Sequence, residues 1–177
     1  MMRLVMSLIL LVAACSFLNA QQPVWQELRS TEGGFSVLMP GAPAPNKVTV
    51  NTSSGVQEAN MFSWSDEGLS EYIVAYSKYS KTDSKVVQTA KLFDKVRDGI
   101  LLAQQGKLLS EAAITLDGYN GREITVERPD GVITMARFFV VGNRFYQLSA
   151  RAKTNGRELE TMKQFLDSFK LLPIQQQ

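Results

Sequence analysis

Nucleophilic chemistry in this sequence would have to come from a short run of serines, lysines and tyrosines at positions 76–81. The sequence contains no histidine and its single cysteine is Cys15, which excludes histidine-based catalytic triads and His/Cys zinc sites. A Ser-Lys pair remains, but Ser77 and Lys78 are neighbours on a predicted strand, so their side chains point to opposite faces. We interpret the run as a solvated strand end and assign no catalytic residue.

Paired carboxylates and glycine-rich turns offer two further kinds of site. Asp94 and Asp98 are four residues apart on a predicted helix, at a spacing that suits an acid–base pair. Basic residues lie within one turn of both, which indicates an ordinary mixed-charge helix face. The glycines at 33–34 and 118–121 lack the spacing of a dinucleotide-binding or Walker loop and predict turns instead. We therefore expect no cofactor and no metal.

Aromatic residues are the remaining candidates for a binding surface. Trp64, Tyr72, Tyr76 and Tyr79 lie on neighbouring predicted strands of one hairpin. Tryptophan and tyrosine are enriched where proteins meet, because they combine a large contact area with a polar tip. The alternative is that these side chains pack beneath a helix, which is the more common arrangement for aromatic residues at strand spacing.

The first twenty residues have the composition of an export signal. Arg3 supplies a positive start, and the apolar run at 4–14 is too short to cross a bilayer but fits a signal-peptide core. Residues 12–15 resemble the bacterial lipobox, in which a diacylglycerol is attached to the cysteine, here Cys15. Cleavage after Ala20 is the competing interpretation, slightly favoured because the apolar run continues past the cysteine. Either one predicts an exported protein, periplasmic or extracellular, with membrane contact only through the leader or a lipid on Cys15.

Composition indicates one compact domain after that leader. The chain has 177 residues, 45% hydrophobic and 20% charged, and the 157 that follow residue 20 can bury a substantial core without disulfides. A net charge of +2 is too small to indicate a nucleic-acid partner. We predict a signal peptide at 1–20, a single domain at 21–172 and a flexible tail at 173–177.

Short alternating segments separated by turn residues predict strands along most of that domain. A two-residue loop, Gly142-Asn143, marks the clearest hairpin, since both residues accept the positive dihedral angles of a primed turn. The predicted strands are 35–39, 47–51, 56–65, 72–79, 113–116, 122–128, 132–141 and 144–152.

Helical spacing of apolar residues predicts two helices. The first has Thr82 or Asp83 as its cap and Gly106 as the left-handed residue after its end, with a stripe of Val86, Ala90, Phe93, Val96, Ile100 and Ala103. The second begins near Asn155 and closes before Pro173, with a stripe of Leu159, Met162, Phe165, Leu166 and Phe169.

The predicted strand at 132–141 is apolar on both faces, which indicates a sheet covered on both sides. We therefore expect an α+β fold, an antiparallel sheet of about seven to nine strands flanked by two helices as an α/β/α sandwich. The alternative, with both helices on one face, stays open at this point.

Three strings carry a resemblance to a known family: Phe-Ser-Val-Leu-Met-Pro-Gly-Ala-Pro at 35–43, Gly-Asn-Arg-Phe-Tyr-Gln-Leu at 142–148 and Phe-Leu-Asp-Ser-Phe-Lys at 165–170. They resemble small exported bacterial proteins with a PsbP-like fold, which is shared with the extrinsic subunit of photosystem II and a nuclear import factor that binds Ran. The resemblance covers most of 35–172. It implies an antiparallel sheet between helices and a history of protein binding, and it carries over no catalytic or ligand residue.

The expected function is a non-catalytic protein-binding module of the bacterial cell envelope, whose partner is another envelope protein. A carrier of a small ligand or lipid is one alternative, and it requires a large apolar cavity. An unrecognised enzyme is the other, and it requires carboxylates or lysines that converge in a cleft with perturbed pKa values.

Overall fold

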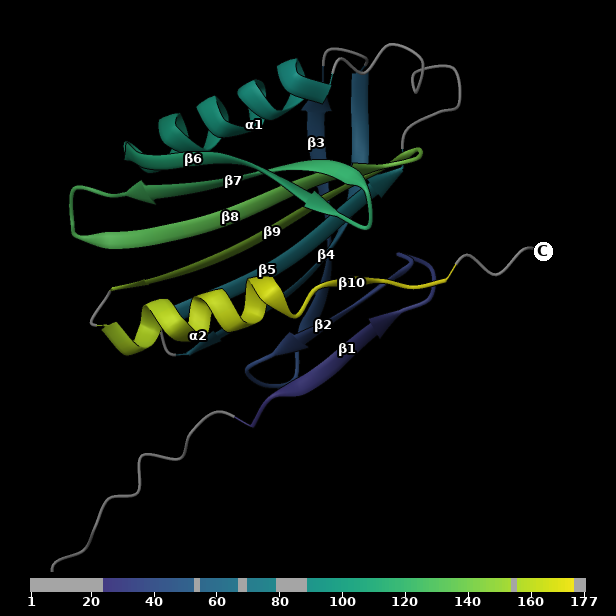
Figure 1. The fold of residues 1–177 in the computed structure, drawn as a ribbon, viewed down its shortest axis with the longest axis horizontal. Helices are drawn as coiled ribbons and strands as arrows, with labels where there is room; N and C mark the ends of the chain where they lie inside the picture. Colours follow the sequence, from purple (N-terminus) through teal and green to yellow (C-terminus); the bar gives the residue numbers. More distant parts are fainter. Residues whose placement is uncertain (1–23, 53–54, 67–69, 79–88, 154–155, 174–177) are drawn as a thin grey trace, which may run out of the picture.

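Two antiparallel sheets and two helices make up the part of the chain that the computed structural model describes, residues 24–52, 55–66, 70–78, 89–153 and 156–173 (Figure 1). The larger sheet has seven strands in the order β3–β4–β5–β9–β8–β7–β6. Its strands are β3 (Ala44–Thr52), β4 (Gly55–Asp66), β5 (Ser70–Lys78), β6 (Lys107–Leu116), β7 (Tyr119–Glu127), β8 (Val132–Val141) and β9 (Arg144–Lys153). Each strand is antiparallel to its neighbours, as the hairpin signals in the sequence predicted.

The smaller sheet has three strands and was not predicted as a separate unit. It consists of β1 (Gln26–Ser30), β2 (Phe35–Met39) and β10 (Lys170–Leu171), with β2 in the centre. β2 matches its predicted range, whereas β1 and β10 have no sequence prediction. β10 has two residues, too few for a recognisable alternation, and it pairs with a strand from the other end of the chain.

The two helices cover opposite faces of the large sheet (Figure 1). α1 (Thr89–Gln104) packs over β7 and β8 through a cluster of Phe93, Ile124, Val126, Ala136 and Phe138. α2 (Gly156–Asp167) lies on the other face beside the small sheet, in a second cluster that includes Phe35, Val74, Leu148, Met162 and Phe165. The predicted α/β/α arrangement is confirmed, with the small sheet added to the α2 layer.

Strand β8 shows why both faces need a cover. Ile133 and Phe139 belong to the cluster beneath α2, whereas Ala136 and Phe138 belong to the cluster beneath α1. Side chains alternate between faces along a strand, so this apolar segment contributes to both cores at once.

The end of α1 differs from its prediction. Gln105, with φ of 50°, is the left-handed residue after the helix, and the Gly106 N–H donates to the Leu101 carbonyl at 3.0 Å. Gly106 serves close packing instead, because a Cβ there would lie 2.4 Å from Val126 Cγ1. The predicted start of this helix, Thr82 to Val86, lies outside the described residues.

The second helix is shorter than the apolar stripe in the sequence predicted. α2 ends at Asp167, so Phe169 is buried from the connection to β10 rather than from a helix that reaches Pro173. Met162, Phe165 and Leu166 are buried as predicted, but Leu159 is 40% exposed. Apolar spacing indicates which side of a helix faces the core, but not over what length the helix touches the sheet. Asn155 lies outside the described residues.

Candidate functional site

Two of the four aromatic candidates are core residues. Tyr72 is 2% exposed and Tyr76 3%, and the Tyr72 ring meets the Phe165 ring edge-on at 5.4 Å between centroids. Trp64 is partly buried 5.8 Å from the Tyr72 ring, and Tyr79 lies outside the described residues. Tyr72 and Tyr76 therefore pack beneath α2 and the small sheet instead of forming an exposed binding surface, which corrects this part of the expectation.

Burial also sets the ionisation of these tyrosines. It raises the pKa of Tyr72 to about 12, with a smaller contribution from the negative charges of Glu158 and Asp66. Burial likewise raises the pKa of Tyr76 and that of Tyr146, whose hydroxyl donates to the Gly33 carbonyl at 2.6 Å. All three stay protonated near neutral pH, which does not suit a general base.

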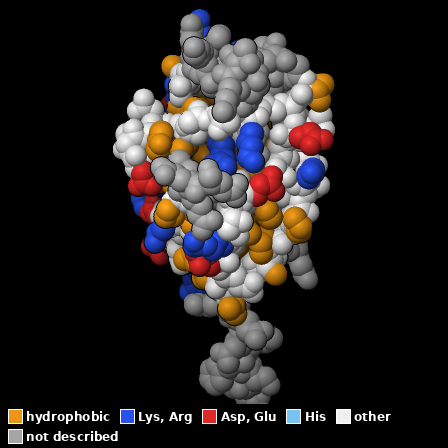
Figure 2. All heavy atoms as spheres, turned by 90° about the vertical axis from the view of Figure 1, so that its right-hand side faces the viewer, with side chains coloured by type: hydrophobic (Ala, Val, Ile, Leu, Met, Phe, Trp, Pro, Cys, Tyr) orange, Lys and Arg blue, Asp and Glu red, His pale blue; other side chains and the backbone are white. Residues whose placement is uncertain are grey.

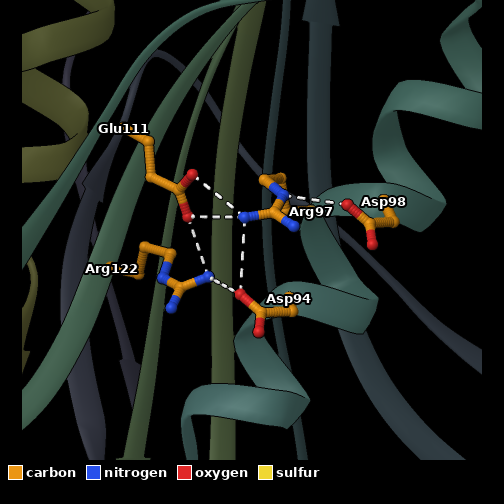
Figure 3. Close-up of polar contacts among 5 residues, drawn as sticks. All are labelled: Asp94, Arg97, Asp98, Glu111 and Arg122. Carbon is orange, nitrogen blue, oxygen red and sulfur yellow. Dashed lines mark hydrogen bonds and ion pairs between the residues drawn. The ribbon is translucent and has the colours of Figure 1, made fainter.

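A network of ion pairs joins α1 to strands β6 and β7 (Figure 3). Arg97 on α1 contacts Asp98 at 2.8 Å and Glu111 of β6 at 3.0 Å. Arg122 of β7 contacts the same Glu111 at 2.8 Å and Asp94 at 2.5 Å. The two carboxylates considered as an acid–base pair, Asp94 and Asp98, are therefore each bound to arginine.

This network holds β6 against the helix. The hydrogen bond from Arg122 is the main reason that the pKa of Asp94 lies below its ordinary value, so Asp94 is ionised at neutral pH. Arg122 also lies over the Phe93 ring, 5.6 Å from its centroid, which links the ion pairs to the core beneath α1. Partly exposed ion pairs contribute little stability each, but here several of them share one strand, and Glu111 is fixed by two arginines.

A groove opens on the other face of β6, beside the end of α2. Its volume is about 390 Å³. Its apolar walls come from β6, β8, α2 and the connection between α2 and β10, and they consist of Ile114, Leu116, Phe139, Leu166 and Phe169. Thr115, Arg137 and Asp167 are its polar members. The groove exists because α2 covers β8 and β9 but leaves the α2-side surface of β6 and β7 open.

A glycine in β7 makes room for one wall of this groove, the Phe139 ring. Gly121 pairs with Ile114 on one side and with Phe139 on the other, so the row of side chains across these strands has a gap in the middle. A Cβ at Gly121 would lie 2.5 Å from two atoms of the Phe139 ring. The Phe139 ring therefore occupies the space that a side chain at Gly121 would need.

Arg137 is the central polar residue of the groove. Its Nε donates to Glu123 Oε2 at 2.6 Å and its Nη2 to Asp167 Oδ1 at 2.7 Å, and the side chain is 16% exposed. These bonds join the end of α2 to β7 and neutralise the guanidinium. The sequence carried a signal for this residue that was not used: Arg137 is the one charged position on an otherwise apolar face of the strand at 132–141.

A second hollow, of about 350 Å³, lies at the opposite end of β6. Polar residues dominate its lining, which consists of Gln105, Lys107, Glu127, Arg128, Pro129 and Gly131. Arg128 pairs with Asp130 at 3.1 Å. The face of the molecule drawn in Figure 2 has positive and negative side chains interspersed among its described residues, rather than gathered by sign.

Among the described residues, no group of three or more acidic or cysteine side chains is placed to hold a metal ion. None of the helices in the same part of the chain has the length and apolar character needed to span a bilayer.

Comparisons with known proteins place this geometry in a known fold. No protein-family model matches the sequence, and neither does any curated protein. Among solved structures, the chain is similar to the cyanobacterial PsbP (CyanoP) of Synechocystis sp. PCC 6803, with a TM-score of 0.56 and 15% identity over 90% of this chain and 98% of that one. It also matches a protein of unknown function from Pseudomonas aeruginosa, with a TM-score of 0.41 and 13% identity over 78% and 88% of the two chains. The relation to the Ran-binding import factor stays an expectation from the sequence. The chain has a PsbP-like fold.

Proposed function

We propose that this protein is an exported, non-catalytic protein-binding module of the bacterial cell envelope, and that it binds another envelope protein through the groove between α2 and β6. The observation that carries the proposal is the composition of that groove, apolar walls around one arginine that is already neutralised by Glu123 and Asp167. Protein interfaces commonly combine an apolar centre with arginine and aromatic residues.

A ligand carrier is less well supported. The space between the large sheet and its α2-side layer is filled by aromatic and aliphatic side chains, and Phe35, Val74, Leu148 and Phe165 are all 0% exposed. The groove beside α2 is open to solvent along β6 and has charged residues at its centre, unlike the enclosed apolar cavity that a lipid needs.

An enzyme is also less well supported. Among the described residues, the groups with a shifted pKa are tyrosines, whose pKa is raised by burial, and Asp94 and Arg97, which take part in ion pairs. None of these groups lines the α2–β6 groove. The usual sign of catalysis is an acid or base with a perturbed pKa that faces a cleft, and the groove therefore gives this alternative no support.

Affinity capture from an envelope extract tests the proposal. We expect the protein to recover a reproducible protein partner, and we expect Ile114→Asp to lose it, because a carboxylate would then stand in the apolar wall. Val56→Asp is the matched control, since Val56 is 72% exposed and lies on β4, far from β6 in the strand order. Circular dichroism checks that both variants fold.

Cell fractionation and intact mass test the export part of the same proposal. The mature protein should start near Gln21, or carry a diacylated Cys15. Recovery of a bound small molecule with no protein partner would overturn the binding proposal, and retention of an unmodified leader in the exported fraction would overturn the processing.

A further inference from the structure

The outer strands of the two sheets differ in how well they are protected against pairing with another chain. Sheet edges carry unpaired backbone groups, and proteins guard them with charged side chains, proline, bulges or very short strands. β1 has Glu27 and Arg29, β3 has Pro45 and Lys47, and β10 has two residues. The last five residues of β6, at 112–116, are Ala-Ala-Ile-Thr-Leu and contain none of these features.

The first half of β6, in contrast, is guarded. It starts with the charged Lys107, and its register with β7 shifts between Leu108 and Ser110, which leaves Leu109 unpaired. From Ser110 to Leu116 the pairing with β7 is regular. The unguarded part of the edge is thus the half that lines the groove.

The geometry of the β6–β7 hairpin identifies the backbone groups on the open side. Asp117 and Gly118 both have positive φ, 50° and 82°, and they form the two-residue turn between Leu116 and Tyr119. The two residues that flank such a primed turn, here Leu116 and Tyr119, bond to each other through both of their backbone groups. Every second residue of β6 before Leu116 bonds to β7 in the same way. Leu116 therefore faces β7 with its backbone, and the N–H groups of Ala113 and Thr115 point away from the sheet.

We propose that this half of β6 accepts an extended segment of the partner protein as an additional strand of the large sheet. The inference rests on the proposed function and specifies how binding occurs. Strand addition at an exposed edge derives affinity from main-chain hydrogen bonds, and specificity from pockets for alternate side chains. Here the outward N–H groups of Ala113 and Thr115 supply the hydrogen bonds, and the groove beside Ile114 and Leu116 receives the side chains.

The surroundings define the chemistry of the added segment. Its residues on the α2 side lie beside Ile114 and Leu116 and are therefore apolar, in alternation with polar residues on the α1 side. Asp117 ends the edge, which favours a basic residue of the added segment at that end. Asp167, at the border of the groove, is already bound to Arg137. Glu111, at the other end, is already bound by two arginines.

A second copy of the chain fits this edge less well. Two β6 strands can pair antiparallel so that residues 112–116 of one copy lie beside residues 112–116 of the other. This register places Ala112 opposite Leu116. The same register places Glu111 opposite Asp117, so a second copy offers Asp117 no basic residue. A partner with a lysine or arginine at this position supplies one.

Selection of short random peptides from a display library against the protein tests the inference. We expect the enriched peptides to contain an alternating apolar and polar segment next to a lysine or arginine. Ala113→Pro removes one outward N–H at an edge position where proline is tolerated, and it should weaken the best peptide about tenfold or more. Ala113→Ser keeps the N–H and should bind as the original does. N-methylation of alternate residues of the peptide should abolish binding.

Hydrogen exchange gives the direct readout, because the Ala113 and Thr115 amides should become protected when the peptide binds. Failure to enrich any peptide, or equal binding by Ala113→Pro, would overturn strand addition. So would a dimer of the protein that Ala113→Pro dissociates, since the occupant would then be a second copy. If a partner depends on Ile114 but not on the Ala113 N–H, the groove binds without an added strand and only this inference fails. If no protein partner is captured at all, the proposed function itself fails.

Discussion

Truncation of Phe165 to alanine tests whether α2 is held on the sheet by its buried aromatic face. Phe165 is 0% exposed, and its ring lies edge-on to that of Tyr72. Removing a buried phenylalanine side chain costs its transfer free energy and leaves a cavity, typically about 3 to 5 kcal/mol. A domain of this kind has a total stability of roughly 5 to 15 kcal/mol, so the loss is a large share of it.

Urea denaturation measures this loss. With a slope of about 2 kcal/mol per molar urea, Phe165→Ala should lower the unfolding midpoint by roughly 2 M. Lys163 is exposed on the same helix, so Lys163→Ala should change the free energy of unfolding by no more than about 0.5 kcal/mol. A second readout is the pKa of Tyr72, which should fall from about 12 towards its ordinary value as water enters the cavity.

Equal midpoints for the two variants would refute this reasoning, because α2 would then not be anchored through Phe165. Loss of partner binding by Phe165→Ala at unchanged stability would refute it as well, since the ring would then face a partner. An unchanged pKa of Tyr72 together with a lowered midpoint would contradict only the proposed contact between the two rings.

Alkaline pH should destabilise the protein, because the pKa of Tyr72 in the folded state is raised from 10 to about 12. The contribution of Tyr72 to the free energy of unfolding is fully present below pH 10 and is lost as the pH rises to 12. The loss amounts to roughly 2 to 3 kcal/mol, and Tyr72→Phe should show a smaller fall between those pH values in denaturation curves. Gly121→Ala should lower the thermal midpoint, because the new Cβ overlaps the Phe139 ring and overpacking costs about 1 to 3 kcal/mol. Gly99→Ala is the control: nothing lies within 4 Å of a Cβ there, and alanine in a helix should raise stability by about 0.5 to 1 kcal/mol, so equal effects would contradict the close approach at Gly121.

The large sheet was largely predictable because its strands are signalled locally. The predicted range 132–141 agrees with β8, the predicted range 144–152 with all but the last residue of β9, and the Gly142-Asn143 turn lies where the sequence indicates. The apolar residues on both faces of β8 also predicted a cover on each side. Such signals need only the alternation along one strand and the chemistry of one turn.

The small sheet and the groove depend on contacts that no local pattern contains. The end of α2 is fixed by Ser168, whose Oγ donates to the Phe165 carbonyl at 2.6 Å and accepts from the Leu38 N–H at 2.9 Å, across 130 residues of sequence. Phe139, which lines the groove, packs its ring against Gly121, its partner in the neighbouring strand. Such a contact is visible only once the register of the strands is known.

The pairing of β2 with β10 ties the first strands of the domain to its last residues, and this has a consequence for the order of folding. Leu171 pairs with Phe35, and the Leu172 N–H donates to the Gly34 carbonyl at 2.9 Å. Contacts between residues so far apart form late, since the chain between them must be ordered first. During synthesis, the β1–β2 hairpin therefore waits with one edge open until the final segment emerges, and a chain cut short before Lys170 would leave Phe35 without that strand partner.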